Sequence, residues 1–174
     1  IKKNFWRQDI RKHEYVIGIA RATGMVALML YVFYESFLPA PFLIPIWMLY
    51  IKDWYEDISK KKEQEFMQQF RDSIQAVASA LKAGYSVENA IREAGRDIVP
   101  LYAENTRIRR EYDRMRRQLD MNMTAEDMLF GLAERTGQED VENFVNVFSA
   151  AKKSGGDSIS IIRNAVKIIS EKID

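Results

Sequence analysis

The sequence predicts an all-α protein: an N-terminal transmembrane helical hairpin followed by a cytoplasmic bundle of about six antiparallel helices. Three observations lead to this fold class. Residues 22–51 form an apolar run in which Glu35 is the only charged side chain. After this run, apolar residues recur every three or four positions, which is the spacing of one helix face. Gly, Ser and Thr turn signals separate these apolar stripes, and no alternating strand pattern is present.

The apolar run is expected to form two helices. Pro39, Pro41 and Pro45 stand in its middle, and each proline removes a backbone donor and clashes with the preceding helical turn. The first leg would cover residues 16–34, about 28 Å of helix, close to the thickness of the hydrocarbon core. The second leg would begin near residue 37 or 42 and end near residue 54, with its prolines in the turn and the first helical turns.

Basic residues flank the hairpin on both sides, whereas the loop between its legs carries only Glu35. By the positive-inside rule both ends therefore lie in the cytoplasm. We accordingly divide the chain into a basic juxtamembrane segment at 1–15, a transmembrane hairpin at 16–55 and a cytoplasmic domain at 56–174. A buried helical hairpin in a soluble protein remains an alternative. A cleaved signal peptide does not fit, because no small-residue cleavage site follows the run.

Composition limits the classes of function. The chain of 174 residues contains no cysteine, so it has neither a disulfide framework nor a thiolate metal site. Residues 56–174 hold 19 Lys or Arg against 21 Asp or Glu, which gives no bulk attraction to nucleic acid. The chain begins at Ile1 and ends at Asp174 inside a helical pattern, so we expect a fragment of a longer protein with later membrane spans outside it.

The first helix of the cytoplasmic domain is expected to continue from the second leg, because residues 46–83 contain neither Gly nor Pro. Its cytoplasmic part carries one apolar stripe, formed by Phe66, Phe70, Ile74, Val77, Ala78 and Leu81. Gly84 is placed to stop this helix, and Ser86 to cap the next one.

Five shorter helices are expected to follow. The first carries Val87, Ala90, Ile91 and Ala94 and ends around residues 95–100. The next covers about 101–119, with Leu101, Ile108, Tyr112, Met115 and Leu119 on its buried side. Thr124 and Asp127 resemble a capping box that opens a helix ended by Gly137. Another carries Val141, Phe144, Val145, Phe148 and Ala151 and stops at Gly155 and Gly156. Asp157 or Ser158 then caps the last, which bears Ile159, Ile162, Val166, Ile169 and Ile173.

Three segments together resemble the cytoplasmic domain of the type II secretion system F family, in particular the inner-membrane platform proteins of Tad-type pilus assembly. They are LKAGYSVENAI at 81–91, LAERTG at 132–137 and FVNVFSAAKKSGGDSISII at 144–162. The last is the most specific, because an apolar helix, a Gly-Gly break and a second apolar helix follow in the family's order. Members usually carry a glycine just before the central helix of the domain, and residues 119–123 contain none.

The resemblance implies a non-enzymatic platform protein in the bacterial cytoplasmic (inner) membrane. Such a protein couples a cytoplasmic secretion ATPase to pilin subunits and associates with itself or with a sister platform protein. The alternatives are a membrane-tethered helical adaptor of unrelated function and a membrane enzyme acting on lipid. We expect no catalytic residue, cofactor or metal, because phosphate-loop, dinucleotide and zinc-protease motifs are absent from the sequence.

The candidate partner-binding residues are arginines of one expected helix. Arg107, Arg110, Arg114 and Arg117 lie three or four positions apart and would form a cationic ridge interrupted by Glu111 and Asp113. A solvated face with intrahelical ion pairs explains this pattern without any partner. An acidic surface of the ATPase or of a sister subunit is the functional alternative. Glu35 is a second candidate, for contact with the charged N-terminus of a pilin.

Overall fold

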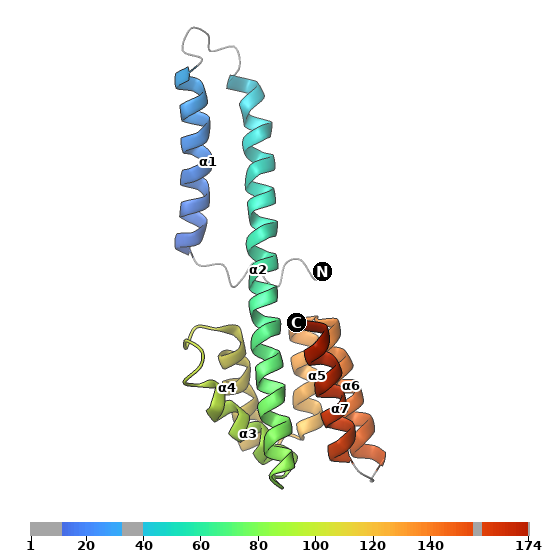
Figure 1. Ribbon diagram of the computed structural model, residues 1–174. Coiled ribbons are helices and arrows are strands. Elements are labelled where there is room, and N and C mark those ends of the chain that lie inside the picture. Colours follow the sequence, from blue (N-terminus) through green and yellow to red (C-terminus); the bar gives the residue numbers. More distant parts are fainter. Residues whose placement is uncertain (1–11, 33–39, 155–157, 174) are drawn as a thin grey trace. The chain divides into compact units, whose positions relative to one another are not determined.

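The computed structural model describes residues 12–32, 40–154 and 158–173. Within these residues the protein forms seven helices and no strand, which confirms the all-α class (Figure 1). The helices are α1 (Lys12–Val32), α2 (Ala40–Lys82), α3 (Val87–Ile98), α4 (Arg107–Asp120), α5 (Ala125–Thr136), α6 (Glu139–Ser154) and α7 (Ser158–Ile173).

The chain divides into two compact units, Ile1–Gln64 and Glu65–Asp174, which we call the hairpin unit and the bundle unit. Helix α2 contributes to both of them. The helices do not support the transmembrane part of the expected fold class. In the described part of the chain, no helix is both long enough and apolar enough to cross a bilayer. Glu35, Gly155, Gly156 and Asp157 lie outside the described residues.

In the hairpin unit, α1 runs alongside the first part of α2 (Figure 1). Gly18 and Ala22, one helical turn apart, are both buried. The indole ring of Trp54 lies so close to Gly18 that a Cβ atom there would be 2.6 Å from it. Tyr15 and Tyr55 also meet edge to face, with ring centroids 5.2 Å apart. The missing side chain of Gly18 thus allows the two helices to approach closely.

The turn between α2 and α3 has the geometry that its residues predict. Gly84 adopts a left-handed φ of 91°, and its N–H donates to Leu81 O at 3.1 Å. The N–H of Tyr85 donates to Ala80 O at 3.2 Å, which completes a Schellman motif. The Ser86 hydroxyl then accepts from the N–H of Asn89 and caps α3. Both predicted roles, the stop at Gly84 and the cap at Ser86, are confirmed.

The turn between α4 and α5 is a second Schellman motif, closed without glycine. Asn122 takes the left-handed position with φ of 60°. Its N–H donates to Leu119 O at 3.1 Å, and the N–H of Met123 donates to Gln118 O at 3.0 Å. Asparagine is the residue that most often replaces glycine at this position. The missing glycine therefore leaves the turn intact.

Two substitutions at Asn122 test this reading of the turn. Asn122→Ala is expected to lower the free energy of unfolding by about 1 kcal/mol, because a Cβ-bearing residue without a local hydrogen-bonding group is strained at positive φ. Asn122→Gly should leave it unchanged or slightly raised. Urea titrations followed by helical circular dichroism measure both variants. Equal losses in the two would show that the Asn122 side chain, and not its backbone conformation, matters.

The start of α4 differs from the sequence-based boundary, whereas α3 ends at Ile98, within the predicted range of 95–100. Leu101 was expected on the buried side of a helix, but it precedes α4 and is 64% exposed. Helix α4 begins only after Thr106, whose hydroxyl donates back to Ala103 O. Helix α3 in turn continues through Gly95 to Ile98. At Gly95, an added Cβ atom would lie 3.1 Å from Cδ1 of Tyr112, so this glycine serves helix packing.

The helices after α4 follow the sequence closely. The N–H of Asp127 donates to the Thr124 hydroxyl at 3.1 Å, and that hydroxyl donates to the Asp127 carboxylate at 2.7 Å. Gly137 ends α5 in the left-handed conformation, with φ of 58°. The predicted cap and stop of this helix are therefore confirmed.

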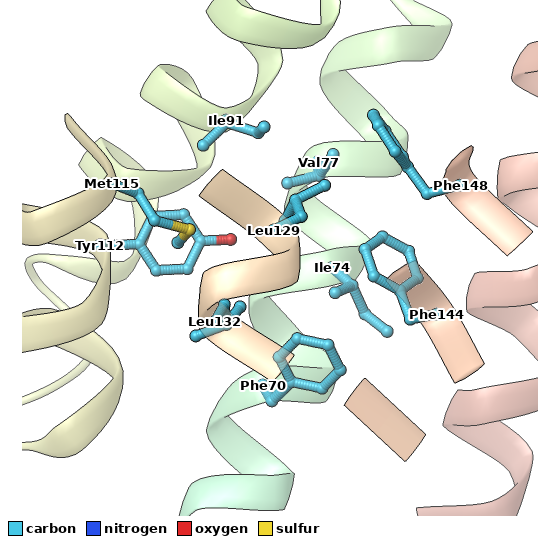
Figure 2. Close-up of a pocket in the computed structure, with 10 residues that line it drawn as sticks. All are labelled: Phe70, Ile74, Val77, Ile91, Tyr112, Met115, Leu129, Leu132, Phe144 and Phe148. Carbon is cyan, nitrogen blue, oxygen red and sulfur yellow. The ribbon is translucent and has the colours of Figure 1, made fainter. Parts of the chain in front are cut away.

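The core of the bundle unit lies where α2 to α6 meet (Figure 2). Along α2, the predicted stripe is buried at Phe66, Phe70, Ile74, Val77 and Leu81, and only Ala78 is half-buried. Phe70 stacks on Phe66 and meets Phe144 of α6 edge to face, with ring centroids 5.9 Å apart. The residues at this junction leave a cavity of about 10 Å³. Such a space is at the lower limit for a single water molecule, so the junction is packed core and no ligand site.

Candidate functional site

Helix α4 is the most strongly charged helix of the bundle unit. It carries six arginines, and its buried side is formed by Ile108, Glu111, Tyr112, Met115 and Leu119. Arg110, Arg114 and Arg117 lie on the opposite side and are exposed. We call these three residues the arginine ridge. The ridge presents guanidinium groups at intervals of about one helical turn, which suits an acidic protein surface.

Arg107 was expected in the same ridge, but it faces inward. Its Nη2 atom lies 3.1 Å from Oε1 of Glu111, and its side chain is only 15% exposed. Nε of Arg135, on α5, donates to Oε2 of Glu111 at 2.9 Å. The Glu111 side chain is 4% exposed. One buried carboxylate thus joins two guanidinium groups from neighbouring helices, and we call these three residues the Glu111 cluster.

Gly131 permits the long reach of Arg135. A Cβ atom at residue 131 would lie 2.8 Å from Nη1 of Arg135, so a side chain there would displace the guanidinium group. The pattern of α4 alone places Glu111 on a solvated face with intrahelical ion pairs, but in the structure its side chain is buried. Its pairing with Arg107 was predictable from the i, i+4 spacing, whereas Arg135 lies 24 residues away.

Arg116 and Asp113 occupy a third side of α4, next to α3. With residues of α3 they line a cleft of about 130 Å³. Arg92 of α3 is also in the lining and pairs with Asp120 of α4, with Nη1 and Oδ1 2.6 Å apart. This cleft was not predicted. The only signal for it in the sequence is the glycine at residue 95, which stands at the start of the range 95–100 predicted for the end of α3.

Two tyrosines of the bundle unit have raised pKa values. Tyr112 is buried, and this burial raises the pKa of its hydroxyl to about 12. Burial also raises the pKa of Tyr102 to about 12, helped by the hydrogen bond that its hydroxyl donates to the Asp72 carboxylate. Tyr102 therefore joins the segment before α4 to α2. Both hydroxyls favour the neutral form in the folded protein.

The raised tyrosine pKa values predict a loss of stability in alkali. In the unfolded chain these tyrosines have their ordinary pKa of 10.0, whereas in the folded protein their pKa is about 12. Their contribution is therefore complete below pH 10.0 and is lost as the pH rises to about 12. Urea titrations across this range should show a falling free energy of unfolding. Tyr102→Phe should make the fall shallower, and Tyr85→Phe, at an exposed position, is the matched control.

Comparison with protein-family models, with curated proteins and with solved structures gave no match to this chain. The assignment of function therefore depends on the residues and geometry described above.

Proposed function

We propose that the protein is a non-enzymatic platform of a Tad-type pilus or type II secretion machine. In this proposal the hairpin unit inserts into the bacterial cytoplasmic membrane and the bundle unit lies in the cytoplasm. The bundle unit contacts a secretion ATPase through the arginine ridge, and the hairpin unit meets pilin subunits. A homo-oligomer or a sister platform protein completes the assembly.

The observation that carries the proposal is the character of the surface that the hairpin unit exposes. Large apolar side chains point outward along α1 and the first part of α2: Val16, Ile17, Met25, Leu28, Met29, Tyr31, Ile44, Ile46, Met48, Leu49 and Tyr50. Soluble monomers rarely expose contiguous apolar surface on this scale. Lipid would cover these side chains, and the buried small residues of α1 would hold the two helices together.

The arginine ridge supports the second part of the proposal. Arg114 and Arg117 are exposed and form no ion pair within the part of the chain that the structure describes. Their planar guanidinium groups match carboxylates in pairs, and rim charges of this kind accelerate association with an oppositely charged partner. Helix α2 runs without a break from Ala40 to Lys82 and belongs to both units. It would carry a displacement of the bundle unit to the hairpin unit.

A co-purification experiment tests the proposed partner. The full chain is expressed with a Tad-type secretion ATPase of the same organism, and the complex is isolated in detergent. The pair Arg114→Glu and Arg117→Glu should abolish recovery of the ATPase, because reversed charges repel an acidic surface. Arg163→Glu reverses an exposed arginine on α7 and is the matched control. Equal recovery with all three proteins would contradict the proposed role of the ridge and would favour a tethered adaptor of unrelated function.

A further inference from the structure

A cleft lies between α3 and α4, apart from the arginine ridge. The cleft of about 130 Å³ has an apolar floor and a charged rim. The floor is formed by Ile91, Gly95, Val99, Tyr112 and Leu119, and the rim by Arg92, Arg96, Asp113 and Arg116. Its volume is of the order of the ~150 Å³ cavity that accommodates a benzene ring. One aromatic or branched aliphatic side chain would therefore fill it.

Gly95 keeps this cleft open. The residue lies inside α3, where glycine costs about 1 kcal/mol of helix stability relative to alanine. A side chain at this position would occupy the floor of the cleft and would press on the ring of Tyr112, whose Cδ1 atom is 3.1 Å from the Cβ position. Val99, at the end of α3, is 48% exposed at the edge of the same floor. The cleft thus offers apolar contact to a side chain from outside.

The rim of the cleft is rich in guanidinium groups that retain hydrogen-bonding capacity. Arg92 uses Nη1 for Asp120, and Arg96 uses Nη1 for Glu93. Each guanidinium has five N–H donors, so both arginines keep donors for another acceptor. Arg116 is exposed and forms no ion pair among the residues that the structure describes. Asp113 is the one carboxylate in the lining.

We propose that this cleft binds a short acidic segment of a partner protein, with one bulky apolar side chain inserted against Gly95 and Tyr112. Carboxylates of the segment would pair with Arg116, Arg92 and Arg96 around that anchor, since arginine forks match carboxylates in geometry and charge. Asp113 would accept a backbone N–H or a lysine of the same segment. A peptide offers a backbone N–H to Asp113 together with carboxylates and an apolar anchor, whereas a nucleic-acid backbone or a phosphatidylglycerol headgroup has no such N–H.

This inference does not require the hairpin unit to insert into a membrane or the partner to be an ATPase. It adds a site on a different side of α4, with its own chemistry. The arginine ridge would contribute charge alone. The cleft would select a segment in which one apolar side chain is flanked by carboxylates. The two sites are separable by mutation, because Arg116 belongs to the cleft and Arg114 to the ridge.

Peptide binding to the full chain in detergent tests the inference. The probe is a fluorescein-labelled synthetic peptide with one Leu flanked on both sides by Glu and Asp, measured by fluorescence anisotropy. Arg116→Glu should weaken binding by about ten-fold or more, and a peptide with Ser in place of Leu should bind about ten-fold more weakly to the unaltered chain. Gly95→Ala should also weaken binding, because its methyl group narrows the floor. Arg114→Glu and Arg163→Glu should leave the affinity within about two-fold.

Three results would overturn the inference. Equal affinity for the Leu and Ser peptides would show that no apolar anchor is used. Equal weakening by Arg116→Glu and Arg163→Glu would show that only overall charge matters. Binding to phosphatidylglycerol vesicles that depends on Arg116, without binding of the peptide, would assign the cleft to lipid. Circular dichroism checks that the helices of each variant remain folded. The comparison of the Leu and Ser peptides uses the unaltered chain, so misfolding of a variant cannot affect it.

Discussion

Replacing the carboxylate of Glu111 by an amide, Glu111→Gln, is expected to lower the free energy of unfolding of the bundle unit by about 3–5 kcal/mol. The substitution preserves size but removes the carboxylate charge that pairs with both Arg107 and Arg135. Their side chains are 15% and 22% exposed, so water would compensate the two guanidinium groups poorly. Urea titration of the full chain in detergent, followed by helical circular dichroism, measures the loss.

Two further variants decide whether the loss arises from removal of the buried negative charge. Glu134→Gln makes the same chemical change at an exposed position of α5 and should cost less than about 0.5 kcal/mol. Replacing the whole Glu111 cluster, by Arg107→Met, Glu111→Leu and Arg135→Met together, should recover most of the stability, because apolar groups of similar volume do not require charge compensation. A triple variant less stable than Glu111→Gln would show that the ion pairs themselves stabilise the bundle unit.

Truncation of the central core side chain, Phe70→Ala, is expected to lower the free energy of unfolding by about 3–5 kcal/mol. Phe70 is 2% exposed and contacts the rings of Phe66 and Phe144. The junction around it has almost no empty space, so removal of the ring leaves a cavity that the backbones of five helices surround. The same urea titration measures this variant.

Phe130→Ala is the matched control for the core prediction. It also removes a phenyl ring, but the ring of Phe130 on α5 is 41% exposed. Less apolar surface is lost from contact and no enclosed cavity forms, so the expected loss is below about 1 kcal/mol. Similar losses at the two positions would mean that the apolar junction of α2 to α6 does not dominate the stability of the bundle unit.

The helices were predictable where a local signal marks both of their ends. Gly84, Ser86, Thr124 and Gly137 act through their own backbone or through a neighbour three residues away, and all four have the predicted roles. The turn at Asn122 carries such a signal as well, because asparagine tolerates the left-handed region. A search for glycine alone therefore misses the turn signal at Asn122.

The boundaries and contacts that were missed depend on residues distant in the sequence. Leu101 continues an apolar pattern, but the segment around it is held by the bond from Tyr102 to Asp72, 30 positions earlier. Gly95 falls within the range predicted for the end of α3, but its packing against Tyr112 of α4 has no signal in the sequence of α3 alone. The sequence of α4 suggests that Glu111 is a surface charge, because its partner Arg135 is 24 positions away and reaches it only in the folded protein. The cleft between α3 and α4 requires both helices and therefore has no signature in either one.

The absence of cysteine from the chain makes one measurement decisive for the proposed topology. Leu28→Cys and Arg114→Cys each introduce a single thiol at an exposed position, the first in the hairpin unit and the second in the bundle unit. Inside-out vesicles of the cytoplasmic membrane are treated with a membrane-impermeant maleimide. We predict rapid labelling of Arg114→Cys and protection of Leu28→Cys until detergent dissolves the bilayer. Equally rapid labelling of both thiols in intact vesicles would show that water, and not lipid, surrounds the hairpin unit.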